Sequence, residues 1–276
     1  MKVIGISSLS AASRLYFSRL AARRQVAAVI HVLPPESGPQ GLDIGVLAGK
    51  LKRFRKAPLR KIRTRLDRIA RGALEVFQPR SVLDPPAAPA VEDLPFDCLP
   101  VPADKLNSPS MVATLASLAP DTIVTHEAPV LTPRVFNTAQ VAALNVHYGI
   151  SPEYRGEHTL FWALYHREFD KVGVTIHELD PGIDTGKVLA YGYPRLEPDD
   201  TEASIATRCT NLAPELTAEV LERLKNKPRI SERQQRPGRL YRYADRTVVH
   251  ELRYAIRRNL LGERLPKQEE RREVKT

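Results

Sequence analysis

Apolar residues recur along this chain in two patterns: short continuous runs, and longer stretches with a helical period. The run at 2–7 predicts a buried strand, the stretch at 15–23 a helix with Ser13 as its N-cap, and the run at 25–33 a second strand. The order strand, helix, strand with short turns is a βαβ opening, which predicts a parallel sheet.

The same patterns return after residue 96 and continue to about residue 225. We therefore expect an α/β fold, with a mostly parallel, Rossmann-like open sheet flanked by helices. The predicted strands are 121–126, 141–147, 172–179 and 186–191, and the predicted helices are 108–118, 159–166 and 201–225.

A segment of different composition interrupts this pattern at residues 40–96. Pro-rich stretches flank it, and from Leu59 to Phe77 apolar residues follow a 3.6-residue period, with Arg and Lys on the opposite face. We predict a basic helical insertion at 40–96 within one domain at 1–225. A basic C-terminal extension at 226–276 follows, with one helical run near 248–261.

Length and charge narrow the class of protein. The chain has 276 residues, 42% of them hydrophobic and 27% charged, a globular mix that can bury a core. Its formal net charge of +10 favours an anionic partner, either nucleic acid, an acidic membrane or a phosphorylated substrate. General solubility is the alternative explanation.

The sequence carries no sign of secretion or membrane insertion. The apolar runs are far shorter than the about 18 residues of a transmembrane helix, and the N-terminal run is too short for a secretory signal. The cysteines Cys98 and Cys209 are too far apart for a metal-binding pair or a disulfide framework. We therefore expect a protein of the reducing cytoplasm.

Three polar residues suggest chemistry. Asn145 and His147 end a predicted strand and share one of its faces, and Asp184 lies in the later loop Asp-Pro-Gly-Ile-Asp-Thr-Gly at 180–186. Sites form at the carboxyl ends of strands in open α/β sheets. An amide, an imidazole and a carboxylate can together polarise a carbonyl and move a proton, which points to acyl transfer.

Each of these signals has a simpler explanation by itself. An Asn at a strand end commonly forms a turn, a His there commonly packs or faces solvent, and a Gly-containing loop is commonly only a turn. On the same grounds we expect His177 to be a packed strand histidine. The histidines at 147, 158, 166 and 177 match no compact zinc pattern, so we expect no metal. The case for a site rests on the motifs occurring together, with Ser151 to Gly156 between them.

Residues 144–192 carry these motifs in one order: Asn-x-His, Ser-Pro-x-Tyr-Arg-Gly, Gly-Val-Thr-x-His and Asp-x-Gly-x-Asp-x-Gly. In this the chain resembles the formyltransferase family that uses 10-formyltetrahydrofolate. That family includes glycinamide ribonucleotide transformylase, methionyl-tRNA formyltransferase and the sugar-nucleotide N-formyltransferases. Weaker similarity extends over 1–23 and 121–144, while 40–96 and the tail after about 225 fall outside it.

The resemblance implies that Asn145, His147 and Asp184 are catalytic. Formyl transfer to a primary amine passes through a tetrahedral oxyanion, to which Asn145 and a protonated His147 can donate; one such donor contributes about 3 kcal/mol. Asp184 can fix the imidazole and position a water, and general acid–base help contributes roughly 10² to 10⁴ in rate.

The resemblance also implies a site for 10-formyltetrahydrofolate as co-substrate. It places one wall at Ala128, Pro129, Val130 and Leu131, where His126 and Glu127 depart from the family's usual pair, and the other wall at Asp180, Pro181, Gly182 and Ile183. For Val130 and Leu131, core packing is an equal alternative. Around the acceptor it implies Arg155, Gly156 and, as a weaker candidate, His158.

The acceptor amine is the least determined part. The first turn, 7–13, lacks the Gly-Ser-Asn phosphate-binding motif of the ribonucleotide transformylase. The short tail predicts no barrel domain like that of methionyl-tRNA formyltransferase. The motif residues are most similar to those of enzymes that formylate a nucleotide-linked amino sugar. Such an amino sugar is an anionic small molecule that suits the positive charge. A methionyl-tRNA formyltransferase-like enzyme is the alternative.

The basic segment leaves further partners open. It could contact tRNA phosphates, lie peripherally on an anionic membrane, or be a solvated helix face. A rival class of function is a formyltransferase-like scaffold repurposed to bind nucleic acid or membrane, against which the intact catalytic trio argues. Whether the protein forms a homo-oligomer is left open by the sequence.

Overall fold

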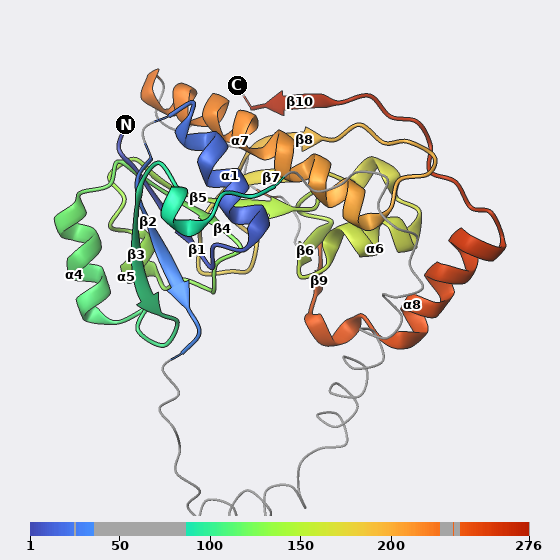
Figure 1. The fold of residues 1–276 in the computed structure, drawn as a ribbon, viewed down its shortest axis with the longest axis horizontal. Coiled ribbons are helices and arrows are strands. Elements are labelled where there is room, and N and C mark those ends of the chain that lie inside the picture. Colours follow the sequence, from blue (N-terminus) through green and yellow to red (C-terminus); the bar gives the residue numbers. More distant parts are fainter. Residues whose placement is uncertain (25, 36–86, 227–233, 235–237, 276) are drawn as a thin grey trace, which may run out of the picture. The chain divides into compact units, whose positions relative to one another are not determined.

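A computed structural model describes residues 1–24, 26–35, 87–226, 234 and 238–275 (Figure 1). Most of the expected basic insertion at 40–96 lies outside these residues, and its described end contains the short 3-10 helix η1 (Val91–Asp93). The chain divides into two units, one of 1–35, 81–241 and 265–276, the other of 36–80 and 242–264. The tail at 226–276 thus contributes to both units.

The first unit is built on an eight-stranded sheet of the order β10-β8-β7-β5-β4-β1-β2-β3. The strands from β5 to β3 in this order run parallel, whereas β7, β8 and β10 pair antiparallel. The expected mostly parallel sheet is therefore confirmed. Its strands are β1 (Val3–Ser7), β2 (Val26–Leu33), β3 (Asp97–Pro102), β4 (Thr122–His126), β5 (Ala142–Tyr148), β7 (Val174–Glu178), β8 (Val188–Tyr193) and β10 (Arg271–Val274).

Helices cover both faces of this sheet, which is why its central strands are continuous apolar runs. On one face, residues from α4 (Pro109–Leu118) and α5 (Pro133–Phe136) join Ile4 and Ile6 of β1 in a buried cluster. Gly5 faces the other side, where a Cβ would lie 2.6 Å from the Phe17 ring of α1 (Ala11–Ala21). The long helix α7 (Glu202–Asn226) packs beside α1.

The sequence patterns predicted these elements correctly, except for the N-cap of α1. All the strands and helices predicted from 2–33 and from 108–225 are present within a few residues of their expected bounds. Helix α1, however, begins at Ala11, and Ser10 is its N-cap, with its hydroxyl accepting from the Ser13 N–H. The correction follows from the small residues Ala11 and Ala12, which are good helix formers and extend the first turn.

The structure adds strands that the sequence did not indicate. Strand β3 contains Pro100 and Pro102, which a sheet tolerates because β3 is an edge strand. Strand β10 is polar and lies at the opposite edge, where Arg271 stacks 3.9 Å from the centre of the Tyr193 ring. A separate parallel pair joins β6 (Tyr154–Gly156) to β9 (Arg239–Tyr241).

The described part of the second unit consists of η3 (Tyr243–Asp245), α8 (Val248–Ala255) and the π-helical turn η4 (Ile256–Leu260). The helical run expected near 248–261 is confirmed. A buried ion pair between Arg246 and Glu251 connects the loop before α8 to that helix. No helix in the described ranges is long and apolar enough to cross a membrane.

A buried polar chain links four elements of the first unit around His126, at the end of β4. Its imidazole stacks on the Tyr16 ring at 4.7 Å; Nδ1 lies 2.8 Å from Ser13 Oγ, and Nε2 lies 3.0 Å from Tyr148 Oη. Tyr148 in turn meets Thr210 of α7 at 2.8 Å. Burial lowers the pKa of His126 to about 4, against a partial opposing effect of Glu127.

This pKa predicts an acid-sensitive fold. Between about pH 6.5 and pH 4 the unfolded chain binds a proton at His126 that the native chain excludes, so the free energy of unfolding falls as pH is lowered. In His126→Gln, which cannot titrate, the fall should be smaller by up to about 3 kcal/mol. Urea unfolding at a series of pH values measures it; identical pH dependences in both proteins would contradict the prediction.

Candidate active site

Strand β5 carries two of the three expected catalytic residues at its carboxyl end. Asn145 and His147 are two positions apart, so both side chains leave the same face of the strand. On the antiparallel neighbour β7, His177 pairs with Asn145 and Thr175 pairs with His147. The sheet register therefore brings a second imidazole beside the predicted pair.

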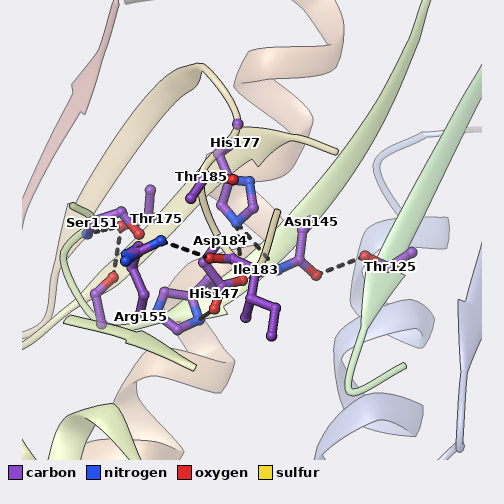
Figure 2. A network of polar contacts seen from close by, with 12 residues as sticks. Thr125, Asn145, His147, Ser151, Arg155, Thr175, His177, Ile183, Asp184 and Thr185 are labelled. Carbon is purple, nitrogen blue, oxygen red and sulfur yellow. Dashed lines mark hydrogen bonds and ion pairs between the residues drawn. The ribbon is translucent and has the colours of Figure 1, made fainter. Parts of the chain in front are cut away.

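The carboxylate of Asp184 lies at the centre of the site (Figure 2). Its Oδ1 accepts a hydrogen bond from Asn145 Nδ2 at 3.1 Å and lies 3.3 Å from His177 Nε2. Its Oδ2 accepts from the Gly156 N–H at 2.7 Å and lies 3.5 Å from His147 Nδ1. The structure thus brings Asn145, His147 and Asp184 together.

Thr125, at the end of β4, determines which way the Asn145 amide faces. The Thr125 hydroxyl lies 2.6 Å from Asn145 Oδ1 and 3.2 Å from the Leu144 carbonyl oxygen. A hydroxyl can donate to the amide oxygen, so the amide nitrogen is the end that faces Asp184. Figure 2 shows this side chain reaching Asn145 from the neighbouring strand.

The protonation of His147 follows from its two neighbours. Nε2 lies 2.8 Å from the Tyr154 carbonyl oxygen, and because a carbonyl only accepts, Nε2 carries a hydrogen. Burial lowers the pKa of His147 and the nearby His177 lowers it further, while Asp184 and the Tyr154 carbonyl raise it; the net pKa is below the ordinary value. The imidazole is therefore neutral at neutral pH, with the lone pair of Nδ1 facing Asp184.

Asp184 remains ionised although it is largely buried. Burial alone raises the pKa of its carboxyl, but His147, His177 and the Gly156 N–H outweigh this effect, so the pKa lies well below its usual range. The backbone of Asp184 has φ 51°, in the left-handed region. Non-glycine residues in that region are uncommon, and they concentrate at functional sites.

His177 was expected to be a packed strand histidine, and it is indeed buried in β7. Its Nδ1 donates to the Glu178 carbonyl oxygen at 2.8 Å, and its Nε2 faces Asp184 Oδ1 at 3.3 Å, a contact that helps to lower the pKa of Asp184. Asn145 Nδ2 lies 3.2 Å from the same His177 Nε2. The Asn145 amide and the His177 imidazole therefore both meet Oδ1 of Asp184.

The residues expected around the acceptor lie beside the Asp184 loop, which we define as residues 180–186. Arg155 is buried and donates to the carbonyl oxygens of Ile183 at 3.3 Å and Gly238 at 2.7 Å. Its Nε has no hydrogen-bond partner among the described residues. Gly156 supplies the N–H described above, and His158 is the N-cap residue of α6 (Thr159–His166), with φ 56°.

The two segments expected to contact folate differ in exposure along their length. Val130 is 68% exposed and Ile183 is 44% exposed, whereas Leu131 is 6% exposed and belongs to the core cluster. Ala128 and Leu179 pack against that same cluster. Val130 and Ile183 are therefore open to a ligand, as are the exposed Pro129 and Pro181, and the Leu131 side chain faces the core.

The glycines of the Asp184 loop are required by the loop itself. Asp180 Oδ1 accepts from the Gly182 N–H at 3.0 Å and from Thr185 Oγ1 at 2.6 Å. A Cβ at Gly182 would lie 1.9 Å from Thr185 Oγ1, and one at Gly186 would lie 1.7 Å from the Glu178 carbonyl oxygen. The close approach that these glycines allow is thus to the chain's own atoms.

Sequence reasoning did not identify Thr125 and Thr175 as site residues, and it assigned His177 only to packing. Thr175 Oγ1 donates to the Gly149 carbonyl oxygen at 2.6 Å and accepts from the Ser151 N–H at 3.1 Å, which fixes the turn after β5. The available signal was polar residues on buried strands next to Asn-x-His, but their use requires the strand order. Within the described part of the chain, no three His, Cys, Asp or Glu side chains group to hold a metal ion.

A family model described as formyl transferase matches residues 73–221, more than half of the chain, and this range contains every residue of the trio. The chain belongs to this formyl transferase family. Family members take the formyl group from 10-formyltetrahydrofolate. The match begins inside the segment 40–96, so the last part of that segment lies within the family region.

Individual relatives match a shorter part. A methionyl-tRNA formyltransferase from Chlorobium chlorochromatii is 30% identical over 124 residues, which are 45% of this chain and 39% of that protein. One from Anaeromyxobacter dehalogenans is 34% identical over 123 residues, 44% of this chain and 39% of that protein. The chain thus spans about two fifths of the length of the relatives it matches.

One solved structure shows the same fold over nearly the whole chain. A sugar N-formyltransferase from Shewanella superposes with a TM-score of 0.55 at 14% identity, over 93% of this chain and 87% of that one. At this identity the likeness shows the fold, and it supports the Rossmann-like sheet described above.

The contacts of His147 predict opposite effects of two substitutions on its pKa. Asp184→Asn removes the charge that raises this pKa and should lower it, whereas His177→Gln removes a group that lowers it and should raise it. NMR titration of the His147 imidazole measures both shifts. Two shifts of the same sign would show that the carboxylate and the second imidazole do not act on His147 as described.

Proposed function

We propose that this protein is an N-formyltransferase that moves a formyl group from 10-formyltetrahydrofolate to a primary amine. The observation that carries the proposal is the arrangement around Asp184, where an oriented amide and a buried imidazole meet one carboxylate. Membership of the formyl transferase family supports it. The family's donor supplies an activated formyl group, and the exposed Val130 and Ile183 are suited to contact its planar rings.

The amide of Asn145 would stabilise the oxyanion that develops when the amine attacks the formyl carbon. Its nitrogen is aimed by Thr125 and held within reach of Asp184 and His177. Asp184 accepts one amide hydrogen, and the other can be donated to an incoming oxygen. Because the amide is oriented in advance, little reorganisation is needed when the charge forms.

His147 would take the proton that the attacking amine loses, directly or through a water. The free imidazole is neutral, and its Nδ1 lone pair is the available base. Once protonated, the ring forms an ion pair with Asp184 and can pass the proton to the leaving nitrogen. One C–N bond forms to the attacking amine and one breaks to the leaving nitrogen. The proton moves from the attacking nitrogen to the leaving nitrogen.

We propose a nucleotide-linked amino sugar as the acceptor. The net charge of +10 favours an anionic substrate, and the buried Arg155, which makes only carbonyl contacts in the described structure, is a donor that an anion could use. The fold shared with a sugar N-formyltransferase is consistent with this choice. An aminoacyl-tRNA is the second candidate, favoured by the identity to methionyl-tRNA formyltransferases.

Incubation with 10-formyltetrahydrofolate and a panel of acceptors tests these candidates. Mass spectrometry should find a formylated product from nucleotide-linked amino sugars and not from methionyl-tRNA. Because a formyl group replaces one amine hydrogen, the product gains CO and should be about 28 mass units heavier. Formylation of methionyl-tRNA alone would replace the first candidate with the second. Tight, salt-sensitive RNA binding without any transfer would favour a repurposed binding protein.

Substitution of Asn145, the proposed oxyanion donor, should lower the rate more than substitution of Thr125, which orients it. Asn145→Ala should lower kcat about 10²- to 10³-fold, because one oxyanion donor is lost. Thr125→Val should lower it less, up to about 100-fold, because the amide remains but is no longer aimed.

Thr122→Val is the matched control on the same strand. Thr122 is buried, and its hydroxyl has no hydrogen-bond partner among the described residues, so kcat should be unchanged. Equal losses in Thr125→Val and Thr122→Val would show that the hydroxyl of Thr125 acts through packing. Steady-state kinetics with the identified acceptor provides the measurement.

A further inference from the structure

A short part of the C-terminal tail lies directly against the Asp184 loop. Gln234 and residues 238–241 follow the region matched by the family model, which ends at residue 221. They nevertheless belong to the same unit as the site. They contact the backbone of the Asp184 loop, and the proposed roles of Asn145, His147 and Asp184 give them no function.

Gln234 holds the two carbonyl groups that flank Thr185. Its Nε2 donates to the Asp184 carbonyl oxygen at 3.0 Å and to the Gly186 carbonyl oxygen at 2.8 Å. One side-chain amide therefore uses both of its hydrogens on the peptide groups that follow Asp184. Its Oε1 is buried without a hydrogen-bond partner in the described structure, so the two N–H donors set the position of the amide.

Further contacts keep the tail in place beside the loop. Arg155 connects the Ile183 carbonyl to the Gly238 carbonyl, as described above. A Cβ at Gly238 would lie 1.7 Å from the Pro152 carbonyl oxygen, so the two backbones touch. Beyond it, β9 pairs with β6, and the Tyr241 carbonyl oxygen accepts from the Glu157 N–H at 3.0 Å.

The backbone of Asp184 has a particular need for such support. Its φ of 51° is unfavourable for a residue with a Cβ and persists only where surrounding contacts enforce it. Gly156 holds the carboxylate, and Gln234 holds the peptide groups on the carboxyl side of the same residue. The two contacts together fix the direction in which the carboxylate leaves the backbone.

We propose that Gln234 is a positioning residue for Asp184, and that Gln234 and residues 238–241 of the tail thereby complete the catalytic site. Gln234 acts through the backbone of the Asp184 loop. Its kinetic consequence rests on the proposed formyl transfer, whereas its effect on the geometry around His147 does not. The tail is then part of the enzyme's machinery, although it lies outside the family region.

Gln234→Met tests this, because it removes both donors while keeping an uncharged side chain of similar length. We expect kcat to fall roughly 10- to 100-fold, as for other residues that orient catalytic groups, with the KM for 10-formyltetrahydrofolate little changed. The matched control is Gln268→Met. Gln268 also ties the tail to the body of the protein, through the Pro194 carbonyl at 3.0 Å, but away from the site. Its kcat should remain that of the wild type.

A second readout separates positioning from general stability and needs no substrate. In Gln234→Met the pKa of His147 should shift downward, toward its value in Asp184→Asn, since a displaced carboxylate raises it less. The amide hydrogens of the Asp184 loop should also exchange faster. If Gln234→Met does not fold, Gln234→Glu removes the same donors with the same shape, and kcat and amide exchange are read instead.

The outcomes are distinct. A folded Gln234→Met with wild-type kcat, His147 pKa and loop exchange would overturn the proposal, as would equal effects in Gln234→Met and Gln268→Met. A wild-type protein that transfers no formyl group would overturn the proposed function alone. In that case the pKa and exchange data still decide whether Gln234 positions Asp184.

Discussion

The site depends on one buried negative charge. Burying an isolated carboxylate is strongly unfavourable, and a protein tolerates it only where hydrogen bonds and opposite or polarised groups surround it. Around Asp184 these are the Asn145 amide, the Gly156 N–H and two imidazoles, and the imidazoles and the Gly156 N–H keep its pKa low despite burial. Because the partners come from β5, β6 and β7, the charge also holds together three segments that are separate in sequence.

In the proposed mechanism, the same charge also sets the chemical roles of the neighbouring groups. An imidazole between a carbonyl and a carboxylate is neutral at rest, yet it has a strong partner as soon as it gains a proton. The amide of Asn145 is oriented from the opposite side by Thr125, so its nitrogen faces Asp184. In that mechanism, proton transfer and oxyanion stabilisation depend on the same carboxylate, and a displacement of Asp184 would affect both. Under this proposal, contacts to its backbone, such as those of Gln234, bear on chemistry as well as stability.

Much of the fold could be predicted because local patterns carry it. The apolar runs of β1, β2, β4 and β5 are buried on both sides, and α6 is an almost continuous apolar run. Helices α4 and α7 begin beside Ser108 and Thr201, whose hydroxyls accept from backbone N–H groups, so period and composition identify these elements. The elements that were missed have no such signal. Strand β10 is mostly charged and β3 contains two prolines; both form because an edge offers an unpaired row of backbone groups. The N-cap of α1 differs by three residues, since several serines in one turn can serve equally well.

The sequence by itself determined the order of the elements, the family, and the trio of Asn145, His147 and Asp184, because these depend on periodicity and on motifs that are local in the chain. Only the tertiary structure decided what surrounds the trio. His177 faces Asn145 because β5 and β7 pair antiparallel in one particular register, and Thr125 reaches it because β4 is the other neighbour. Gln234 arrives from a tail 50 residues beyond the carbonyl it holds. Strand order and long-range contacts arise from packing the whole chain, so no local pattern records them.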